Sequence, residues 1–133
     1  MEEVLIDTSV WILSFHRQGH ENLKSILKEL ISADRAVMTG MVWLELLQGA
    51  KSEPDAKQLA TRLKVLPRKE AGENIWSDIA LLYRSLRRKG MTIPIPDLWI
   101  AQVAMQYDLV LMHCDRDYES IARYSTLKTM YFG

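Results

Sequence analysis

Five carboxylate side chains stand at positions where a folded chain could use them for chemistry. They come from four separate segments: Asp7, Glu45, Asp97, and the pair Asp115 and Asp117. Asp7 and the pair follow short apolar runs that we expect to be strands, whereas Glu45 and Asp97 belong to apolar segments that we expect to be helices. In open α/β sheets, ligands bind outside the carboxyl ends of the strands. We therefore expect all four segments to bring their carboxylates to that one edge.

Carboxylates gathered at one edge favour metal-dependent hydrolysis of a phosphodiester bond. Like charges that crowd together raise one another's pKa unless a cation compensates them. Carboxylate oxygens are hard ligands that suit Mg²⁺ or Mn²⁺. His16, His20 and His113 lack the mutual spacing of a zinc site, so we expect them to be structural or exposed. A divalent ion beside a phosphodiester can activate water and neutralise the charge on the displaced oxygen.

Each carboxylate also has an ordinary structural interpretation. Asp7 and Asp97 stand where an N-cap would be, and aspartate is a preferred N-cap residue. Glu45 could be a solvated helix residue, and Asp115 and Asp117 could belong to a turn. Because four segments deliver acidic residues to one edge of one sheet, the set as a whole favours the functional interpretation.

Apolar periodicity and helix-stop residues predict the elements that must position these carboxylates. Strands are predicted over 4–6, 36–39, 109–112 and 127–132, and helices from residue 10 and over 21–31, 41–48, 55–66, 73–89, 97–107 and 120–124. The stretch 94–96 is expected to be non-helical, because a proline disfavours the helical conformation in the residue before it. Strands alternating with helices predict an α/β fold with three layers, α/β/α, around a small, mostly parallel central sheet. We expect one domain spanning residues 1–133.

Composition excludes several classes of protein. The chain has 133 residues with 17 basic and 17 acidic side chains, so a global positive field for nucleic acid or membranes is absent. The single cysteine, Cys114, excludes an internal disulfide framework and fits a reducing compartment. The N-terminus is acidic and lacks the apolar region of a secretory signal, and the apolar runs are too short to span a bilayer. We expect a cytoplasmic protein.

A local basic cluster remains within this neutral chain. Arg84, Arg87, Arg88 and Lys89 stand together at the end of a predicted helix. They could bind RNA phosphates, which would make binding dependent on salt. They could equally be there because cations interact favourably with the C-terminus of a helix.

Four segments of the sequence carry a resemblance to a known family. They are Leu5-Ile6-Asp7-Thr8-Ser9, Trp43-Leu44-Glu45-Leu46-Leu47, Pro96-Asp97-Leu98-Trp99-Ile100-Ala101 and Asp115-Arg116-Asp117-Tyr118. In order, spacing and overall length they resemble the PIN domains, and among these the VapC-type toxins of bacterial and archaeal toxin–antitoxin pairs. The resemblance covers essentially the whole chain and implies a PIN-like α/β/α fold.

The resemblance also implies a set of site residues. The resemblance implies a catalytic cluster that holds Mg²⁺ or Mn²⁺ and consists of Asp7, Glu45, Asp97 and Asp115. It implies Asp117 as a further metal-binding residue. Many relatives have a Thr-Arg-Asn-like stretch where this chain has His113-Cys114-Asp115, which leaves open whether Asp115 or Asp117 is the direct ligand. The hydroxyls of Thr8 and Ser9 could orient Asp7 or the substrate, or could act only as helix caps.

The activity implied by the resemblance is that of a metal-dependent endoribonuclease. Its expected partners are an RNA substrate such as a tRNA or rRNA, a cognate VapB-type antitoxin, and a second copy of the chain in a homodimer. A non-catalytic PIN-fold scaffold that binds RNA or protein is the alternative, although all four catalytic positions are acidic here. A phosphatase of the haloacid-dehalogenase type would need Asp-x-Asp where this chain has Asp7-Thr8-Ser9. Cleavage of DNA or of flap structures also stays open, although the short chain lacks the insertions of such enzymes.

Overall fold

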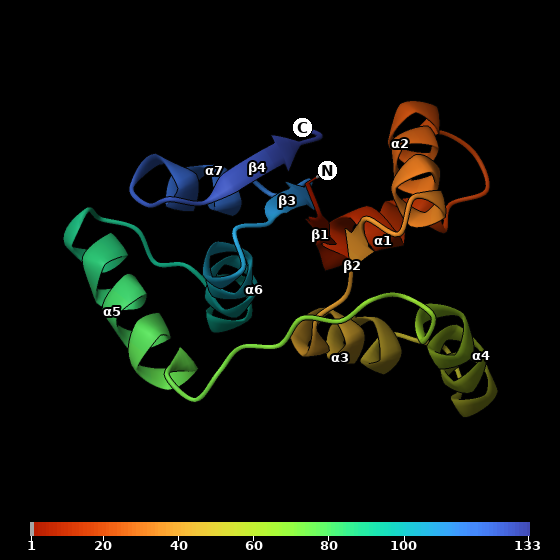
Figure 1. Ribbon diagram of the computed structural model, residues 1–133, viewed down its shortest axis with the longest axis horizontal. Helices are drawn as coiled ribbons and strands as arrows, with labels where there is room; N and C mark the ends of the chain where they lie inside the picture. Colours follow the sequence, from red (N-terminus) through yellow and green to blue (C-terminus); the bar gives the residue numbers. More distant parts are fainter. Residues whose placement is uncertain (1) are drawn as a thin grey trace.

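The computed structural model describes residues 2–133, which form a small sheet flanked by helices (Figure 1). The strands are β1 (Val4–Ile6), β2 (Ala36–Val37), β3 (Val110–His113) and β4 (Lys128–Tyr131). The helices are α1 (Thr8–Ser14), α2 (Glu21–Ser32), α3 (Gly40–Gln48), α4 (Glu53–Leu63), α5 (Ile75–Arg88), α6 (Ile95–Gln106) and α7 (Arg116–Arg123). Strands and helices alternate along the chain as the sequence pattern predicted.

The four strands form one sheet in the order β2-β1-β3-β4, and every pairing among the described residues is parallel. Leu5 pairs with Val37 on one side and with Leu111 on the other, so β1 and β3 are the two central strands. All three residues of β1 are buried. Full burial is typical of a parallel strand that is covered on both faces.

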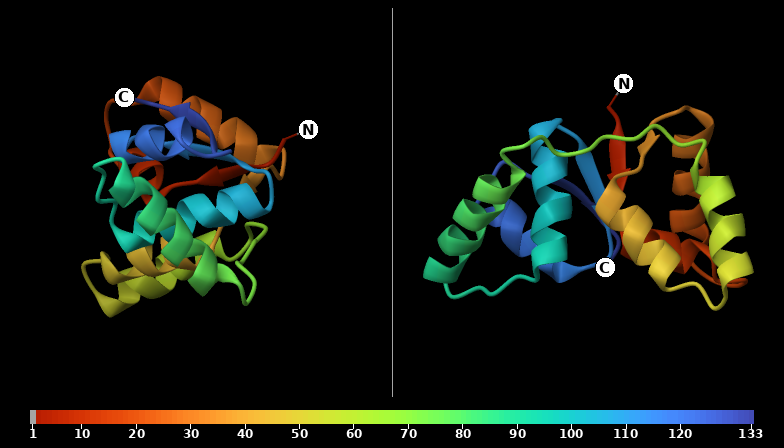
Figure 2. Two further views of the ribbon diagram at one scale, coloured as in Figure 1. Left: turned by 90° about the vertical axis from the view of Figure 1, so that its left-hand side faces the viewer. Right: turned by 90° about the horizontal axis from the view of Figure 1, so that it is seen from below.

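Helices cover both faces of the sheet, which confirms the expected three-layer fold. In Figures 1 and 2, α2 lies on one side of the sheet, and α3, α4 and α6 lie on the other. Helix α5 packs against α6 at the outside of this second layer. Among residues 2–133, none of the helices has the length and apolar character needed to cross a membrane.

Two helices begin earlier than the sequence pattern predicted. Helix α6 starts at Ile95. The expectation that residues 94–96 are non-helical is therefore confirmed for Pro94 and wrong for Ile95 and Pro96. Pro94 is extended (φ −58°, ψ 143°) and takes the N-cap position, while Pro96 lies in the first turn, where its missing N–H would have had no helical partner. Helix α7 starts at Arg116 rather than at residue 120. The other predicted elements are confirmed, and their ends differ from the predicted ones by a few residues.

A segment that follows α4 runs alongside β2. The N–H of Met38 donates to the carbonyl of Pro67 (2.9 Å), and the N–H of Lys69 donates to the carbonyl of Met38 (3.0 Å). This parallel bridge directs the next residue, Glu70, towards the first turn of α3. The segment therefore connects the sheet edge to the helix that carries Glu45.

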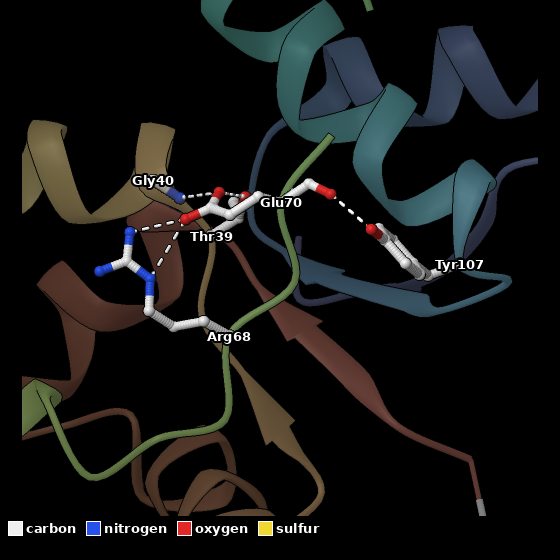
Figure 3. Close-up of polar contacts among 5 residues, drawn as sticks. All are labelled: Thr39, Gly40, Arg68, Glu70 and Tyr107. Carbon is white, nitrogen blue, oxygen red and sulfur yellow. Dashed lines mark hydrogen bonds and ion pairs between the residues drawn. The ribbon is translucent and has the colours of Figure 1, made fainter. Parts of the chain in front are cut away.

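The carboxylate of Glu70 caps the N-terminus of α3 (Figure 3). One oxygen accepts hydrogen bonds from the N–H of Gly40 (2.8 Å) and from Oγ1 of Thr39 (2.9 Å), and the other pairs with Arg68 (2.6 Å). The backbone carbonyl of Glu70 accepts a hydrogen bond from the hydroxyl of Tyr107 (2.5 Å) at the end of α6. Glu70 thus joins α3, the segment beside β2 and α6.

His113 has a structural role, as expected from its lack of ligand spacing. Its side chain is fully buried at the end of β3 and stacks on the ring of Tyr131 (4.9 Å between centroids). Nδ1 accepts a hydrogen bond from the N–H of Asp115 (3.1 Å), so Nε2 is the nitrogen that donates to Glu119 (2.8 Å). His16 and His20 are exposed.

Candidate active site

The sheet order brings the carboxylates of Asp7 and Asp115 to one edge. Asp7 directly follows β1, and Asp115 follows β3 by one residue. Because β1 and β3 are parallel neighbours, their carboxyl ends lie side by side. The N–H of Asp7 donates to the carbonyl of Met112 in β3 (2.9 Å), which continues the ladder to the edge of the site. The expectation that these two segments meet is confirmed.

Asp7 is held by three hydrogen bonds to its two carboxylate oxygens. Oδ2 accepts from the N–H and the hydroxyl of Ser9 (3.0 and 2.5 Å), and Oδ1 accepts from the hydroxyl of Tyr118 (2.7 Å). Only 5% of Asp7 is exposed. Oδ2 also caps α1, which confirms the structural interpretation of Asp7 as an N-cap. The hydroxyl of Ser9 accepts a further hydrogen bond from the N–H of Cys114 (3.1 Å), which ties the ends of β1 and β3 together.

Tyr118 is a site residue that sequence reasoning missed. Its side chain is 1% exposed, and burial together with the nearby charge of Asp7 raises the pKa of its phenol. The phenol is therefore protonated near neutral pH and donates its proton in the hydrogen bond to Asp7. The available signal was its spacing, because Tyr118 lies one helical turn after Asp115 on the inner face of α7.

Asp97, Asp115 and Asp117 form the tightest group of carboxylates. One oxygen from each lies within 4.8 Å of the others. Asp97 lies in the first turn of α6, and Asp117 lies in the first turn of α7. Asp115 is the N-cap of α7, and its Oδ1 accepts the N–H of Asp117 (2.9 Å). Asp97 itself is not an N-cap, because α6 starts before it.

Glu45 approaches the site from α3 and is held by α1. Its Oε1 accepts a hydrogen bond from the hydroxyl of Thr8 (2.7 Å). Thr8 and Ser9 are neighbours in the first turn of α1, and each orients one carboxylate of the set. Ser9 therefore contacts Asp7 as expected, whereas Thr8 orients Glu45 rather than Asp7.

The pKa of Asp97 shows how strongly the five carboxylates interact. Burial and the charges of Asp115, Asp7, Asp117 and Glu45, in that order, raise it from 3.8 to about 7. Burial and the charge of Asp115 also raise the pKa of Asp117. Near neutral pH the cluster therefore holds a proton on Asp97 that an isolated aspartate would have lost.

The donor set fits a hard divalent cation. It consists only of carboxylate oxygens, and the same crowding that raises the pKa of Asp97 would be relieved by positive charge. The hydrogen bonds from Thr8, Ser9 and Tyr118 orient Glu45 and Asp7 and leave acceptor positions free on Oδ1 of Asp7 and on both oxygens of Glu45. Such partners are typical of residues that hold metal ligands in place.

Comparisons with known families and sequences relate this chain to PIN domains and to ribonucleases. Residues 4–124 match the PIN domain family. A VapC ribonuclease of Mycobacterium bovis is 31% identical over 134 residues, an alignment that covers 97% of this chain and 98% of the relative. Ribonuclease VapC11 of Mycobacterium tuberculosis matches with the same identity and coverage.

Solved structures share the fold at low sequence identity. The VapBC2 structure of Rickettsia felis, bound to a DNA fragment from its promoter, has a TM-score of 0.79 at 18% identity and covers 98% of both chains. The VapC20 structure of Mycobacterium tuberculosis, described as a Sarcin-Ricin loop cleaving toxin, has a TM-score of 0.61 at 16% identity. It covers 89% of this chain and 94% of VapC20.

Proposed function

Because the chain belongs to the PIN domain family and aligns over nearly its whole length with VapC ribonucleases, we propose that it is a metal-dependent endoribonuclease toxin of a VapBC-type toxin–antitoxin pair. One observation carries the proposal. Five carboxylates from four segments meet at the carboxyl edge of the sheet, closely enough to raise the pKa of Asp97 to about 7. Such a cluster is unfavourable by itself and favourable around a divalent cation.

We propose the following ligands. Asp97, Asp115 and Asp117 each offer an oxygen to a shared position, and Asp7 and Glu45 complete the site from β1 and α3. Mg²⁺ is the proposed ion, and Mn²⁺ would substitute for it because both prefer carboxylate oxygens. Bound there, the ion would supply an activated water and neutralise charge on the departing oxygen of a phosphodiester.

The chain's own residues orient the carboxylates and control a proton. Ser9 and Tyr118 keep both oxygens of Asp7 in place, and Thr8 does the same for Glu45. Asp97 holds a proton near neutral pH while the cluster is uncompensated, and binding of a cation would release it.

The proposed partners are an RNA, a VapB-type antitoxin protein and a second copy of the chain. Half-exposed apolar side chains support a protein partner, because Ile12 of α1 and Phe15 at the end of this helix line a hollow that also contains Glu45. A protein bound over this hollow would cover the carboxylates and prevent RNA from reaching them. We propose a cytoplasmic location, where RNA is present.

The test is cleavage of a mixed RNA pool by purified protein, free of antitoxin, with Mg²⁺ or Mn²⁺. Asp7→Asn keeps the shape of the side chain and removes its charge, so we expect cleavage to be lost in a folded protein. Asp55→Asn is the matched control, because Asp55 is exposed in the first turn of α4. Equal cleavage by wild type and Asp7→Asn would refute the proposed site. No cleavage by the wild type on any RNA would favour a non-catalytic scaffold that binds RNA or protein.

A further inference from the structure

The segment from Ile79 to Pro96 differs in charge from the rest of the chain. It contains four basic residues and no acidic residue, in a protein whose basic and acidic side chains are equal in number. The remaining residues therefore carry four more acidic than basic side chains. This segment comprises most of α5, the connection to α6 and the first two residues of α6, and it ends next to Asp97.

The four cations of this segment lie on the surface of the protein. Arg84, Arg87, Arg88 and Lys89 are all exposed, and none of them takes part in an ion pair formed within residues 2–133. Arg84, Arg87 and Arg88 line a shallow hollow together with Tyr83, whose hydroxyl accepts a hydrogen bond from Arg87 (3.0 Å). We call these four cations the α5 basic surface.

The interaction of cations with a helix C-terminus explains only part of this surface. That effect is confined to the last turn of a helix, which contains Arg87 and Arg88. Arg84 lies a turn earlier, and Lys89 is the residue that ends α5. A group of exposed cations that repel one another is unfavourable in the isolated protein, so the arrangement indicates an anionic partner.

The α5 basic surface lies beside the candidate active site. Figure 2 (right) shows that the end of α5 and the start of α6 lie at the same end of the molecule, and Asp97 is in the first turn of α6. Nζ of Lys89 also lies 4.8 Å from the ring centre of Tyr124, the residue that ends α7. Helix α7 has 8 residues, and its first turn holds Asp117. Lys89 of the basic surface and the carboxylate of Asp117 are therefore near opposite ends of a helix about 12 Å long.

We propose that the α5 basic surface binds the phosphate backbone of the RNA on one side of the bond that is cleaved. The proposal rests on the proposed ribonuclease function and names the surface that holds the substrate. Because the carboxylates repel RNA, a neutral protein needs positive charge nearby to hold the strand over them. Arg87 and Lys89 lie over the rings of Tyr83 and Tyr124, so aromatic groups stand next to the cations of this surface.

The test compares two double variants that lose the same charge. Arg84→Gln/Arg88→Gln removes two cations of the surface, and Lys57→Gln/Arg62→Gln removes two exposed cations of α4, which lies at the opposite end of the molecule (Figure 1). Gln keeps a high helix propensity, and circular dichroism checks that both variants fold. Binding of a fluorescent single-stranded RNA is measured in the Asp7→Asn background at fixed Mg²⁺ and increasing KCl.

We expect the α5 variant to bind the RNA with a salt slope that is less steep by about 1.4, since each lost phosphate contact removes about 0.7. In the otherwise wild-type enzyme the same variant should raise KM for RNA and leave kcat within about twofold. The α4 variant should match its parent in both measurements. An equal change in both variants would mean that only net charge matters, and would overturn the proposal.

Three further outcomes separate this proposal from the ribonuclease function. Cleavage by the wild type with unchanged RNA binding in the α5 variant would overturn the basic surface alone. RNA binding that weakens only in the α5 variant would support the surface even if no RNA were cleaved. Loss of self-association or of antitoxin binding with unchanged RNA binding would assign the surface to a protein partner instead.

Discussion

Single aspartates at the candidate site combine helix capping with a place in the carboxylate cluster. Asp7 caps α1 with Oδ2 and receives the phenol of Tyr118 on Oδ1. Asp115 likewise caps α7 and contributes an oxygen to the carboxylate group. A carboxylate has two oxygens and about four acceptor positions, so capping one helix leaves capacity for another partner. For this reason the two interpretations of such an aspartate are not exclusive.

The phenol of Tyr118 is predicted to position Asp7 for cation binding. Tyr118→Phe keeps the buried ring and removes the donor to Oδ1. We expect the Mg²⁺ concentration needed for half-maximal cleavage to rise about tenfold, as for other residues that support metal ligands. Thermal unfolding should show a loss of about 2 kcal/mol, since the lost hydrogen bond is to a charged group. Tyr107→Phe is the control, because it also loses a hydrogen bond but lies away from the site; the same shift in Mg²⁺ dependence there would contradict the assignment.

Asp97 is predicted to make the metal-free protein less stable as pH rises. Its pKa in the folded state is about 7, against a usual value of 3.8, so the folded state holds the extra proton between these values. Stability therefore falls as pH increases from about 4 to 7 and levels off above. The melting temperature, measured against pH in the presence of a chelator, should follow this course.

Asp97→Asn should remove most of this pH dependence and melt at a higher temperature than the wild type at pH 8. The raised pKa of Asp117 leaves a smaller fall of the same sign in the variant. A flat profile in the wild type would show that the carboxylates do not interact as strongly as their positions imply.

At the scale of the elements, helix α3 is held in place by side-chain hydrogen bonds at two points. Glu70 accepts hydrogen bonds at its first turn, and Thr8 of α1 donates to Glu45 in its second. Partial burial tends to raise the pKa of Glu70, but hydrogen bonds from Gly40, Arg68 and Thr39 outweigh it and hold the pKa below its usual value. A negative charge at this place also interacts favourably with the helix N-terminus.

Loss of the Glu70 charge is predicted to weaken the attachment of α3. Glu70→Gln should lower the free energy of unfolding by about 0.5–1 kcal/mol at pH 7. Because the folded-state pKa is lowered, this contribution is present above pH 4.5 and is lost as pH falls through the folded pKa. Urea titrations at pH 7 and pH 4 should show the difference from wild type shrinking at the lower pH. Glu73→Gln, at a nearby exposed carboxylate, should leave stability unchanged; an equal loss there would rule out a specific role for Glu70.

For the whole molecule, the strand order decides where the site forms. The order β2-β1-β3-β4 makes β1 and β3 neighbours although more than a hundred residues separate them. Helices α3 and α6, which carry Glu45 and Asp97, lie on the same side of the sheet (Figure 2), and the charge of Glu45 acts on Asp97. The carboxylates meet at the carboxyl edge of the sheet, which is where open parallel sheets generally place their binding sites.

Divalent cations are predicted to stabilise the whole fold through this edge. Mg²⁺ or Mn²⁺ should raise the melting temperature by several degrees at saturation, because the ion binds only the folded state. The rise should be larger at pH 8 than at pH 6, since at the lower pH the proton on Asp97 must first be displaced. Scanning calorimetry measures both effects, and Asp97→Asn should reduce them while Asp55→Asn should not. A rise that is independent of pH and of Asp97 would place the ion elsewhere.

The sequence by itself determined the α/β alternation, most element positions and the acidic residues, because apolar periodicity and capping chemistry act over a few residues. It misjudged the starts of α6 and α7, where a proline in the first turn and a capping aspartate permit helix earlier than the pattern indicated. Only the tertiary structure decided which residues meet. The bonds from Tyr118 to Asp7 and from Thr8 to Glu45 span 111 and 37 residues, and no local pattern encodes them. The raised pKa of Asp97 has the same origin, since burial and four charges from other segments act on it only after the chain has folded.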